Sequence, residues 1–345
     1  MTDVPGLDVE GLRAWLARAH PERDAGPLTA SVIAGGRSNL TYAVEGASVP
    51  LVVRRPPLGH VLSSAHDMRR EHRVISALAG SAVPVPVAVD VVDDVADAAV
   101  TGTVFLTMER APGRVLARRS QNAALTPAGA RALSVELATV LARLHAVRPG
   151  DVGLDGFGRP DGYLDRQLST WRRQLDASRS RPVPVLDRLQ ERLHEDVPRS
   201  DRAGIVHGDY RLDNALVTGD GDAPRISAVL DWEMATLGDP LVDLGILGLY
   251  WDIARLPGAF GRVVPSAVDP AAGYASFDEL VEVYAEEAGI AVPDLRWHRA
   301  FAAYKLAVIL EGIHCRYQQG GTVGEGFDLI GQLVEPLAAH GTEAA

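Results

Sequence analysis

The sequence contains very little of several residue types, and each shortage excludes a class of protein. One cysteine in 345 residues, Cys315, excludes an intramolecular disulfide and a cysteine-rich zinc site. No apolar run is long enough to span a membrane, and residues 1–6 lack the apolar core of a signal peptide. The net charge is −11 and no basic stripe is present. We therefore expect a cytoplasmic protein without a membrane or nucleic-acid partner.

Lysine is almost absent as well. Lys305 is the only lysine in the sequence, and arginine occupies all the other positions in the Lys and Arg total of 34. A Walker A phosphate loop requires Gly-Lys followed by Ser or Thr, so this chain cannot contain one. Any side chain that binds phosphate as a cation in the first half of the chain must therefore be an arginine.

Among the residues that are present, a polar run bracketed by apolar residues is the most informative. Residues 205–217 read IVHGDYRLDNALV, and residues 226–233 read ISAVLDWE, with Asp231 directly after an apolar strand. A short polar run between two β-type runs predicts a functional loop on a rigid base. Asp209, Asn214 and Asp231 provide a catalytic base and two oxygen ligands for Mg²⁺, the groups that phosphoryl transfer from ATP requires.

The order and spacing of these residues resemble a kinase. Asn214 follows Asp209 by five positions, as in the protein-kinase catalytic loop. Gly208 replaces the arginine of that loop, and Leu-Asp-Trp-Glu at 230–233 replaces Asp-Phe-Gly. With these variants the chain resembles the small-molecule kinases of the aminoglycoside phosphotransferase and choline kinase type. His-Gly-Asp alone is typical of an ordinary turn, but the two segments together favour a kinase.

This resemblance implies an α+β protein with a bilobal protein-kinase-like fold. We expect a small antiparallel-sheet N-lobe over residues 1–108, containing an N-terminal helix, a five-stranded sheet and one further helix. A hinge at 109–113 and a larger, mainly helical C-lobe at 114–345 follow. The length of 345 residues suits two lobes. Apolar spacing predicts helices over 7–20, 126–145, 276–288 and 295–318, and a short final helix over 322–337.

A glycine-rich turn at 34–39 lies between two β-type runs of the first lobe. In kinases such a turn covers the nucleotide phosphates, because glycines let backbone N–H groups approach phosphate oxygens closely. The candidate contacts are Gly35, Gly36, Ser38 and Asn39. Taken alone, the same sequence is also typical of a plain hairpin turn.

Arg54 ends the third expected strand, where kinases place a phosphate-binding lysine. Arg55 points to the opposite face, and either residue could be a solvated strand end; we take Arg54 as the inward cation. Residues 63–78 predict a helix capped by Ser64, with Glu71 on its apolar face. Because a buried carboxylate needs a cation, we expect an Arg54–Glu71 ion pair that serves the nucleotide. A surface position for Glu71 is the alternative.

A connector at 109–113 follows a strand and contains Pro112 and Gly113. In the family that the motifs resemble, the backbone of this connector binds the adenine ring, which implies nucleotide contacts at Glu109 and Ala111. An ordinary loop is the alternative. The resemblance also implies that Asp239 and Asp243 brace the catalytic loop.

These residues predict a direct, in-line transfer of phosphate. Asn214 and Asp231 hold Mg²⁺ on ATP, and Asp209 accepts the proton of the acceptor hydroxyl. Arg211 either contacts the transferred phosphate or packs within the loop.

The acceptor is expected to be a small molecule with a hydroxyl group. Residues 53–74 and the His-Gly-Asp loop resemble phosphotransferase domains fused to, or encoded beside, acyl-CoA dehydrogenases. That branch implies a hydroxyacyl-CoA acceptor, such as a 4-hydroxyacyl-CoA, and a functional link to a dehydrogenase. Three alternatives remain: a kinase of aminoglycosides or other antibiotics, a nucleotide-binding pseudokinase that scaffolds a partner, and a metal hydrolase using His207, Asp209 and Asp213. The hydrolase lacks a second His-rich cluster.

Overall fold

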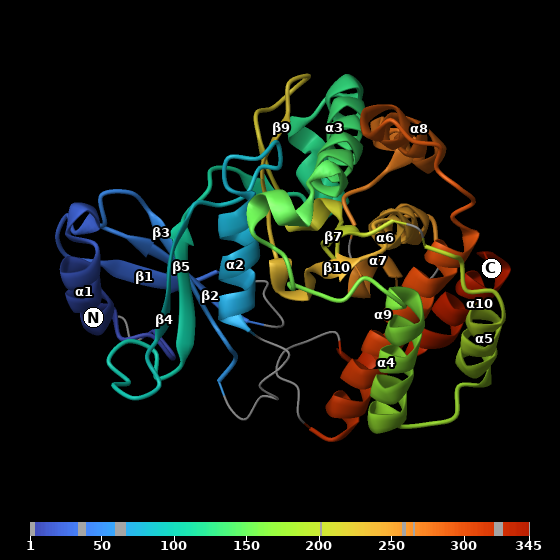
Figure 1. Cartoon of the computed structure of the whole chain (residues 1–345), viewed down its shortest axis with the longest axis horizontal. Coiled ribbons are helices and arrows are strands. Elements are labelled where there is room, and N and C mark those ends of the chain that lie inside the picture. Colours follow the sequence, from blue (N-terminus) through green and yellow to red (C-terminus); the bar gives the residue numbers. More distant parts are fainter. Residues whose placement is uncertain are drawn as a thin grey trace. The chain divides into compact units, whose positions relative to one another are not determined.

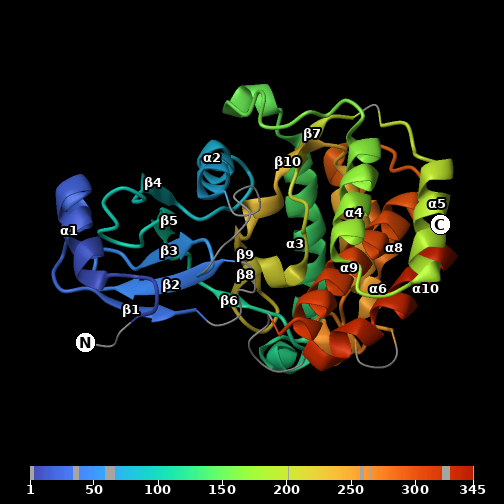
Figure 2. The same ribbon diagram turned by 90° about the horizontal axis from the view of Figure 1, so that it is seen from below.

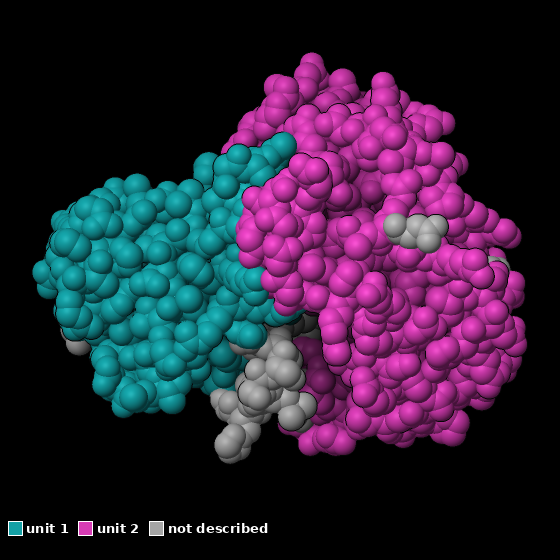
Figure 3. Space-filling model, viewed as in Figure 1, with its two compact units in different colours: residues 1–112, 227–233 teal, residues 113–226, 234–345 magenta. Residues whose placement is uncertain are grey.

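The chain divides into two compact units in a computed structural model (Figures 1 and 3). The structure describes residues 4–33, 39–58, 67–200, 202–256, 260–264, 266–320 and 327–344. Unit 1 comprises Met1–Pro112 and Ser227–Glu233, and unit 2 comprises Gly113–Ile226 and Met234–Ala345. A small antiparallel-sheet unit and a larger, mainly helical unit confirm the predicted fold class.

Unit 1 is built on a five-stranded antiparallel sheet in the order β1-β2-β3-β5-β4. Alternate residues of its strands, such as Leu51 and Val53, are fully buried against helix α1. The neighbouring position, Arg54, therefore points to the opposite face, which carries helix α2. The elements of the unit are α1 Val9–Ala19, β1 Thr29–Val32, β2 Leu40–Glu45, β3 Leu51–Arg55, α2 Met68–Leu78, β4 Ala88–Asp93 and β5 Val104–Glu109.

Helix α2 begins at Met68, because Asp67 caps it by accepting hydrogen bonds from the N–H groups of Arg69 and Arg70. The cap predicted from sequence, Ser64, lies outside the described residues. Met68, Glu71, Val74, Ile75 and Leu78 form its buried face. Glu71 is thus a single carboxylate in an apolar stripe, as its helical position predicts.

The turn after β4 is organised by one buried carboxylate. Asp94 is 4% exposed and accepts hydrogen bonds from four successive backbone N–H groups, those of residues 99–102, at 2.6–2.9 Å. Burial alone would raise the pKa of Asp94, but these four hydrogen bonds outweigh it and lower the pKa. The ionised side chain therefore stabilises a turn that has no regular secondary structure of its own.

Replacing this carboxylate with an amide should destabilise unit 1. We expect Asp94→Asn to lower the free energy of unfolding by about 1–3 kcal/mol, because an amide cannot accept four hydrogen bonds. Asp97→Asn, an exposed position in the same turn, is the matched control. Because the folded-state pKa is lowered, the stabilisation by Asp94 is present above the ordinary Asp pKa and disappears as pH falls through the lowered one. Urea titrations at neutral and acidic pH would show the difference between wild type and variant shrinking; a constant difference contradicts this account.

Unit 2 is mainly helical, and its core is formed around α9, which packs against α4, α6 and α10 (Figure 2). The chain also forms two short sheets, one of β7 and β10 and one in the order β6-β8-β9. The last residues of β9 belong to the Ser227–Glu233 segment of unit 1. The elements are β6 Arg114–Val115, α3 Pro127–Ala146, α4 Tyr163–Ser178, α5 Pro184–Glu195, β7 Gly204–Val206, β8 Ala215–Thr218, β9 Arg225–Val229, β10 Thr236–Gly238, α6 Leu241–Ile253, α7 Phe260–Val263, α8 Phe277–Ala288, α9 Arg296–Gln318 and α10 Val334–Ala344. None of the described helices combines the length and apolarity needed to cross a membrane.

Two helices of unit 2 differ from expectation. Helix α6 was not predicted, because almost all of its residues are buried and no polar stripe marks a helical period. The predicted final helix over 322–337 starts outside the described residues, and its predicted end is wrong: a 3-10 helix covers Phe327–Gln332, and α10 runs from Val334 to Ala344. The end of α10 packs closely on its neighbours, since a Cβ at Gly341 would lie 2.8 Å from Leu189 and 3.0 Å from Ala303.

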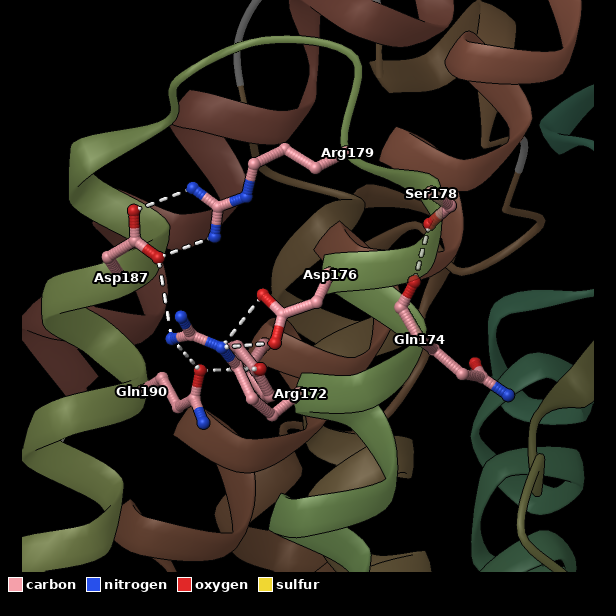
Figure 4. Close-up of polar contacts among 8 residues, drawn as sticks. Arg172, Gln174, Asp176, Ser178, Arg179, Asp187 and Gln190 are labelled. Atoms are coloured by element: carbon pink, nitrogen blue, oxygen red, sulfur yellow. Dashed lines mark hydrogen bonds and ion pairs between the residues drawn. The ribbon is translucent and has the colours of Figure 1, made fainter.

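Two arginines tie α4 to α5. Arg179 donates to both carboxylate oxygens of Asp187, at 2.9 and 2.6 Å (Figure 4). Arg172 donates to Asp176 on its own helix and to Gln190 on α5. These contacts are internal to unit 2, so the two arginines serve its structure.

Candidate active site

In unit 1, Arg54 forms the predicted ion pair with Glu71. Its Nη1 lies 2.5 Å from Glu71 Oε1, and its Nη2 lies 3.0 Å from Asp231 Oδ1. Burial alone would lower the pKa of Arg54, but Glu71 and Asp231 outweigh it and raise the pKa. Burial raises the pKa of Glu71, and Arg54 opposes that rise. One guanidinium thus connects the helix carboxylate with the carboxylate that the sequence assigns to Mg²⁺.

Arg55 has a different environment. Its Nη1 donates to the carbonyl oxygens of Gly6 and Thr101, at 2.8 and 2.9 Å. It therefore ties the N-terminal segment to the turn before β5. The alternation of side chains along β3 separates a structural arginine from one that faces Glu71.

Asp231 lies at a strained point of the backbone. Its φ is 65°, in the left-handed region that non-glycine residues rarely adopt. The adjacent Trp232 is fully buried, and its Nε1 donates to the Val229 carbonyl at 2.9 Å, which anchors the turn. The Asp231 side chain is 32% exposed and directs Oδ1 to Arg54. The residue with this strained backbone thus presents its carboxylate to Arg54.

The glycine-rich turn is described only at its end. The predicted phosphate contacts Gly35, Gly36 and Ser38 lie outside the described residues. Asn39 is 3% exposed, and its Nδ2 donates to Glu233 Oε2 at 2.8 Å. This contact, which the sequence did not predict, links the end of the turn to the segment that carries Asp231.

The connector after β5 uses some of its backbone groups internally. The N–H of Glu109 donates to the Val87 carbonyl, and the Glu109 side chain accepts from Arg23 at 2.8 Å. Within the described residues, the amide of Ala111 has no hydrogen-bond partner. A nucleotide edge could therefore be recognised by the Ala111 amide, whereas the Glu109 amide is already engaged.

In unit 2, the loop between β7 and β8 brings Asp209 and Asn214 together. The Nδ2 of Asn214 donates to Asp209 Oδ2 at 2.9 Å and to the Asp209 carbonyl at 2.8 Å. The Asp209 side chain is 27% exposed. Because the amide nitrogen faces Asp209, the amide oxygen of Asn214 is left for a cation, as a Mg²⁺ ligand requires.

A buried aspartate braces this loop, as the resemblance implies. Asp243 on α6 is fully buried and accepts from the N–H groups of His207 and Gly208, at 2.7 and 2.8 Å. It also lies 3.2 Å from His145 Nε2. Burial alone would raise the pKa of Asp243, but these donors outweigh it and lower the pKa, so the brace is ionised. Asp239 instead accepts from the N–H of Leu241 at 2.9 Å, at the start of α6, and lies 3.4 Å from His298 Nε2.

Arg211 packs within the loop. Its Nη1 lies 2.9 Å from Asp213 Oδ2, its Nε lies 3.3 Å from Asp209 Oδ2, and its guanidinium carbon is 4.7 Å from the centroid of the Tyr250 ring. Of the two roles that the sequence left open, the observed contacts favour packing. Tyr250, on the unpredicted helix α6, is a part of the site that sequence reasoning missed.

The only lysine also reaches this loop. Lys305, in the middle of α9, is 8% exposed, and its Nζ donates to the Gly208 carbonyl at 2.5 Å. The ammonium lies 5.3 Å from the centroid of the Trp171 ring. Burial lowers the pKa of Lys305, and the charges of Asp209 and Asp243 oppose that decrease. In the sequence, Lys305 stands out only because it is the sole lysine. That fact does not indicate where its side chain lies in the fold.

The observed contacts disfavour the hydrolase alternative. His207 is fully buried, and its Nδ1 accepts the N–H of Asp209 at 3.2 Å. Asp213 is paired with Arg211. Across the described ranges, no three His, Cys, Asp or Glu side chains form a group suited to a metal ion.

Comparison with known proteins gives a consistent result. Residues 29–302 match the family model described as "Phosphotransferase enzyme family". Acyl-CoA dehydrogenase family member 11 of Gallus gallus is 32% identical over 343 residues, which is 98% of this chain and 43% of that protein. The chain thus spans less than half the length of this relative.

Solved structures share the fold. A crystal structure of a Ralstonia eutropha JMP134 protein named for the aminoglycoside phosphotransferases has a TM-score of 0.81 and 33% identity, with 98% of each chain covered. A mutant of aminoglycoside 2'-phosphotransferase-IIIa in complex with GDP has a TM-score of 0.65 and 14% identity, covering 98% of this chain and 99% of that one.

Proposed function

Because this chain belongs to the phosphotransferase enzyme family, we propose that it is a Mg²⁺-dependent kinase that transfers the terminal phosphate of ATP to a hydroxyl of a small molecule. The observation that carries the proposal is the hydrogen bond from the Asn214 amide to the Asp209 carboxylate. It joins a base and an oxygen ligand in one loop, the pairing that phosphoryl transfer uses.

The proposal assigns roles in the reaction to residues of both units. In unit 2, Asp209 accepts the proton of the acceptor hydroxyl, and the Asn214 oxygen is one ligand for Mg²⁺. In unit 1, Asp231 is the second ligand, Arg54 binds nucleotide phosphate, and Glu71 orients Arg54. The donor set fits the ion, because carboxylate and amide oxygens are the ligands that Mg²⁺ prefers. Bound Mg²⁺ supplies neutralisation of charge on the phosphate oxygens.

The remaining nucleotide contacts follow the same reasoning. Gly35, Gly36, Ser38 and Asn39 cover the phosphates, and the connector at Glu109 and Ala111 contacts the adenine edge. The Glu109 amide already donates to the Val87 carbonyl, whereas the Ala111 amide is available within the described residues. An adenine contact at Ala111 is therefore better supported than one at Glu109. Arg211 supports Asp209 from within the loop.

Removing the Arg54 cation should weaken the use of ATP. We expect Arg54→Ala to lower kcat/KM for MgATP by about 10²-fold, because a preorganised cation beside the phosphates is lost. Arg54→Lys should retain more activity, since it keeps the charge. Arg55→Ala is the matched control: it removes the bonds to Gly6 and Thr101 and should lower stability while leaving KM for MgATP unchanged. An equal rise in KM for the Arg54 and Arg55 variants would contradict the assignment.

For the acceptor, we propose a hydroxyacyl-CoA, with a functional link to an acyl-CoA dehydrogenase. The names of the relatives that match nearly the whole of this chain support this choice. A second candidate, an antibiotic kinase, is favoured by the 33% identity to the Ralstonia eutropha protein and by 27% identity to viomycin phosphotransferase over 150 residues.

One acceptor panel separates these functions. Purified protein with MgATP is incubated with 4-hydroxyacyl-CoAs, the corresponding free hydroxy acids, and aminoglycosides, and phosphorylated products are identified by mass spectrometry. Phosphorylated acyl-CoA is the expected product. Transfer to aminoglycosides alone would establish the second candidate. Nucleotide binding without transfer to any acceptor or to water would indicate a pseudokinase and overturn the proposal.

A further inference from the structure

Lys305 is a buried cation, and burying a charge is energetically unfavourable. A buried ammonium loses its hydration and must recover that loss through hydrogen bonds or charges. Its bond to the Gly208 carbonyl is the one hydrogen bond that the Lys305 ammonium makes within the described residues. The groups that face it are the Trp171 ring from α4, the loop carbonyl, and the charges of Asp209 and Asp243. Its contacts therefore concentrate on the catalytic loop.

The peptide group between Gly208 and Asp209 is held at both ends. Its carbonyl accepts from Lys305 Nζ, and its N–H donates to His207 Nδ1 at 3.2 Å. Gly208 has a φ of +86°, and a Cβ there would lie 2.9 Å from Met234, so only glycine fits. Glycine also allows this peptide plane to rotate easily, and rotation would swing the Asp209 side chain away from its place.

We propose that Lys305 is a positioning residue of the reaction: its ammonium fixes the Gly208–Asp209 peptide plane and so holds the Asp209 carboxylate in place for the acceptor hydroxyl. This inference rests on the proposed function for its catalytic consequence. Lysine suits the position better than arginine, because an ammonium is a compact donor that can meet a carbonyl and a ring face together. Asp243 fixes the preceding amide, so helices α6 and α9 clamp successive peptide groups of the loop.

The test compares Lys305→Met, Lys305→Gln and Lys305→Arg in the full chain. Lys305→Met should lower kcat by about 10²-fold, because small misplacements of a catalytic group are costly. KM for MgATP should be unchanged, since no nucleotide contact is lost. Lys305→Arg keeps a charged donor and should recover much of the rate. Lys305→Gln keeps a neutral donor, and its rate should be intermediate. The glutamine variant remains informative if the methionine variant does not fold. Arg299→Met is the matched control. It removes a cation from the same helix, but Arg299 pairs with Asp252 and not with the loop.

A second readout does not depend on activity. Hydrogen exchange of the amides of residues 207–214 should accelerate in Lys305→Met or Lys305→Gln and stay unchanged in Arg299→Met. If wild type neither transfers phosphate nor hydrolyses ATP, the proposed function fails, while the exchange result still decides whether Lys305 holds the loop. Unchanged exchange, or a rise in KM for MgATP with kcat intact, would overturn the inference.

Discussion

Asp209→Asn should remove nearly all turnover while leaving MgATP binding intact. The substitution keeps the size of the side chain and an oxygen that can accept from Asn214, but it removes the group that takes the proton of the acceptor hydroxyl. General-base catalysis typically contributes 10²–10⁴-fold, so we expect kcat to fall by about 10³-fold. Calorimetric titration with a non-hydrolysable ATP analogue should give a dissociation constant close to that of wild type.

The matched variant is Asp213→Asn in the same loop. Asp213 pairs with Arg211 and has no assigned step, so its loss should reduce the rate far less than the loss of Asp209. Comparing the two separates base catalysis from general disturbance of the loop. Near-normal turnover in Asp209→Asn would remove this residue as the base, and an equally severe loss in Asp213→Asn would revive a role for the second carboxylate.

Asp231→Ala should reduce transfer almost as much as loss of the base. This variant loses a metal ligand and also the carboxylate partner of Arg54 Nη2. Because positioning and electrostatic stabilisation supply most of the rate in phosphoryl transfer, we expect kcat to fall by about 10³-fold. The Mg²⁺ concentration needed for half-maximal rate should rise steeply, which a Mg²⁺ titration of the residual activity would measure.

Two further variants interpret this result. Asn214→Ala should show the same increase in Mg²⁺ requirement, because it removes the other proposed ligand. Asp220→Ala removes an exposed carboxylate that pairs with Arg114, and its rate and Mg²⁺ requirement should match wild type. If the Asp231 variant kept the wild-type Mg²⁺ requirement, Asp231 would have a role only in orienting Arg54.

The sequence predicts site residues best where a local pattern in the chain indicates their partners. Asp209 and Asn214 lie in one loop, and their spacing alone predicts that they share it. Glu71 could be matched to Arg54 because a lone carboxylate on an apolar helix face requires a cation, and the structure contains that pair. In each case a local pattern was enough to limit the choice of partner.

Contacts between distant segments were harder to predict. The bonds from Asn39 to Glu233 and from Arg54 to Asp231 join residues far apart in the chain, and no periodic pattern indicates them. Lys305 and Tyr250 lie on α9 and α6, helices buried on most sides, where a functional residue leaves no break in an amphipathic stripe. Their roles became visible only when tertiary packing placed them against the loop.

The assignment of Ser227–Glu233 to unit 1 has a consequence for how the protein is made. During translation the sheet leaves the ribosome before this segment is synthesised, and all of Gly113–Ile226 emerges in between. Until then, Arg54 lacks the Asp231 carboxylate, and the Pro84 carbonyl lacks the Val229 N–H that it accepts at 2.8 Å. A gene fragment truncated at Pro112 would therefore encode an incomplete sheet unit, and a nascent chain must delay completion of its first unit until the Gly113–Ile226 part of the second has been synthesised.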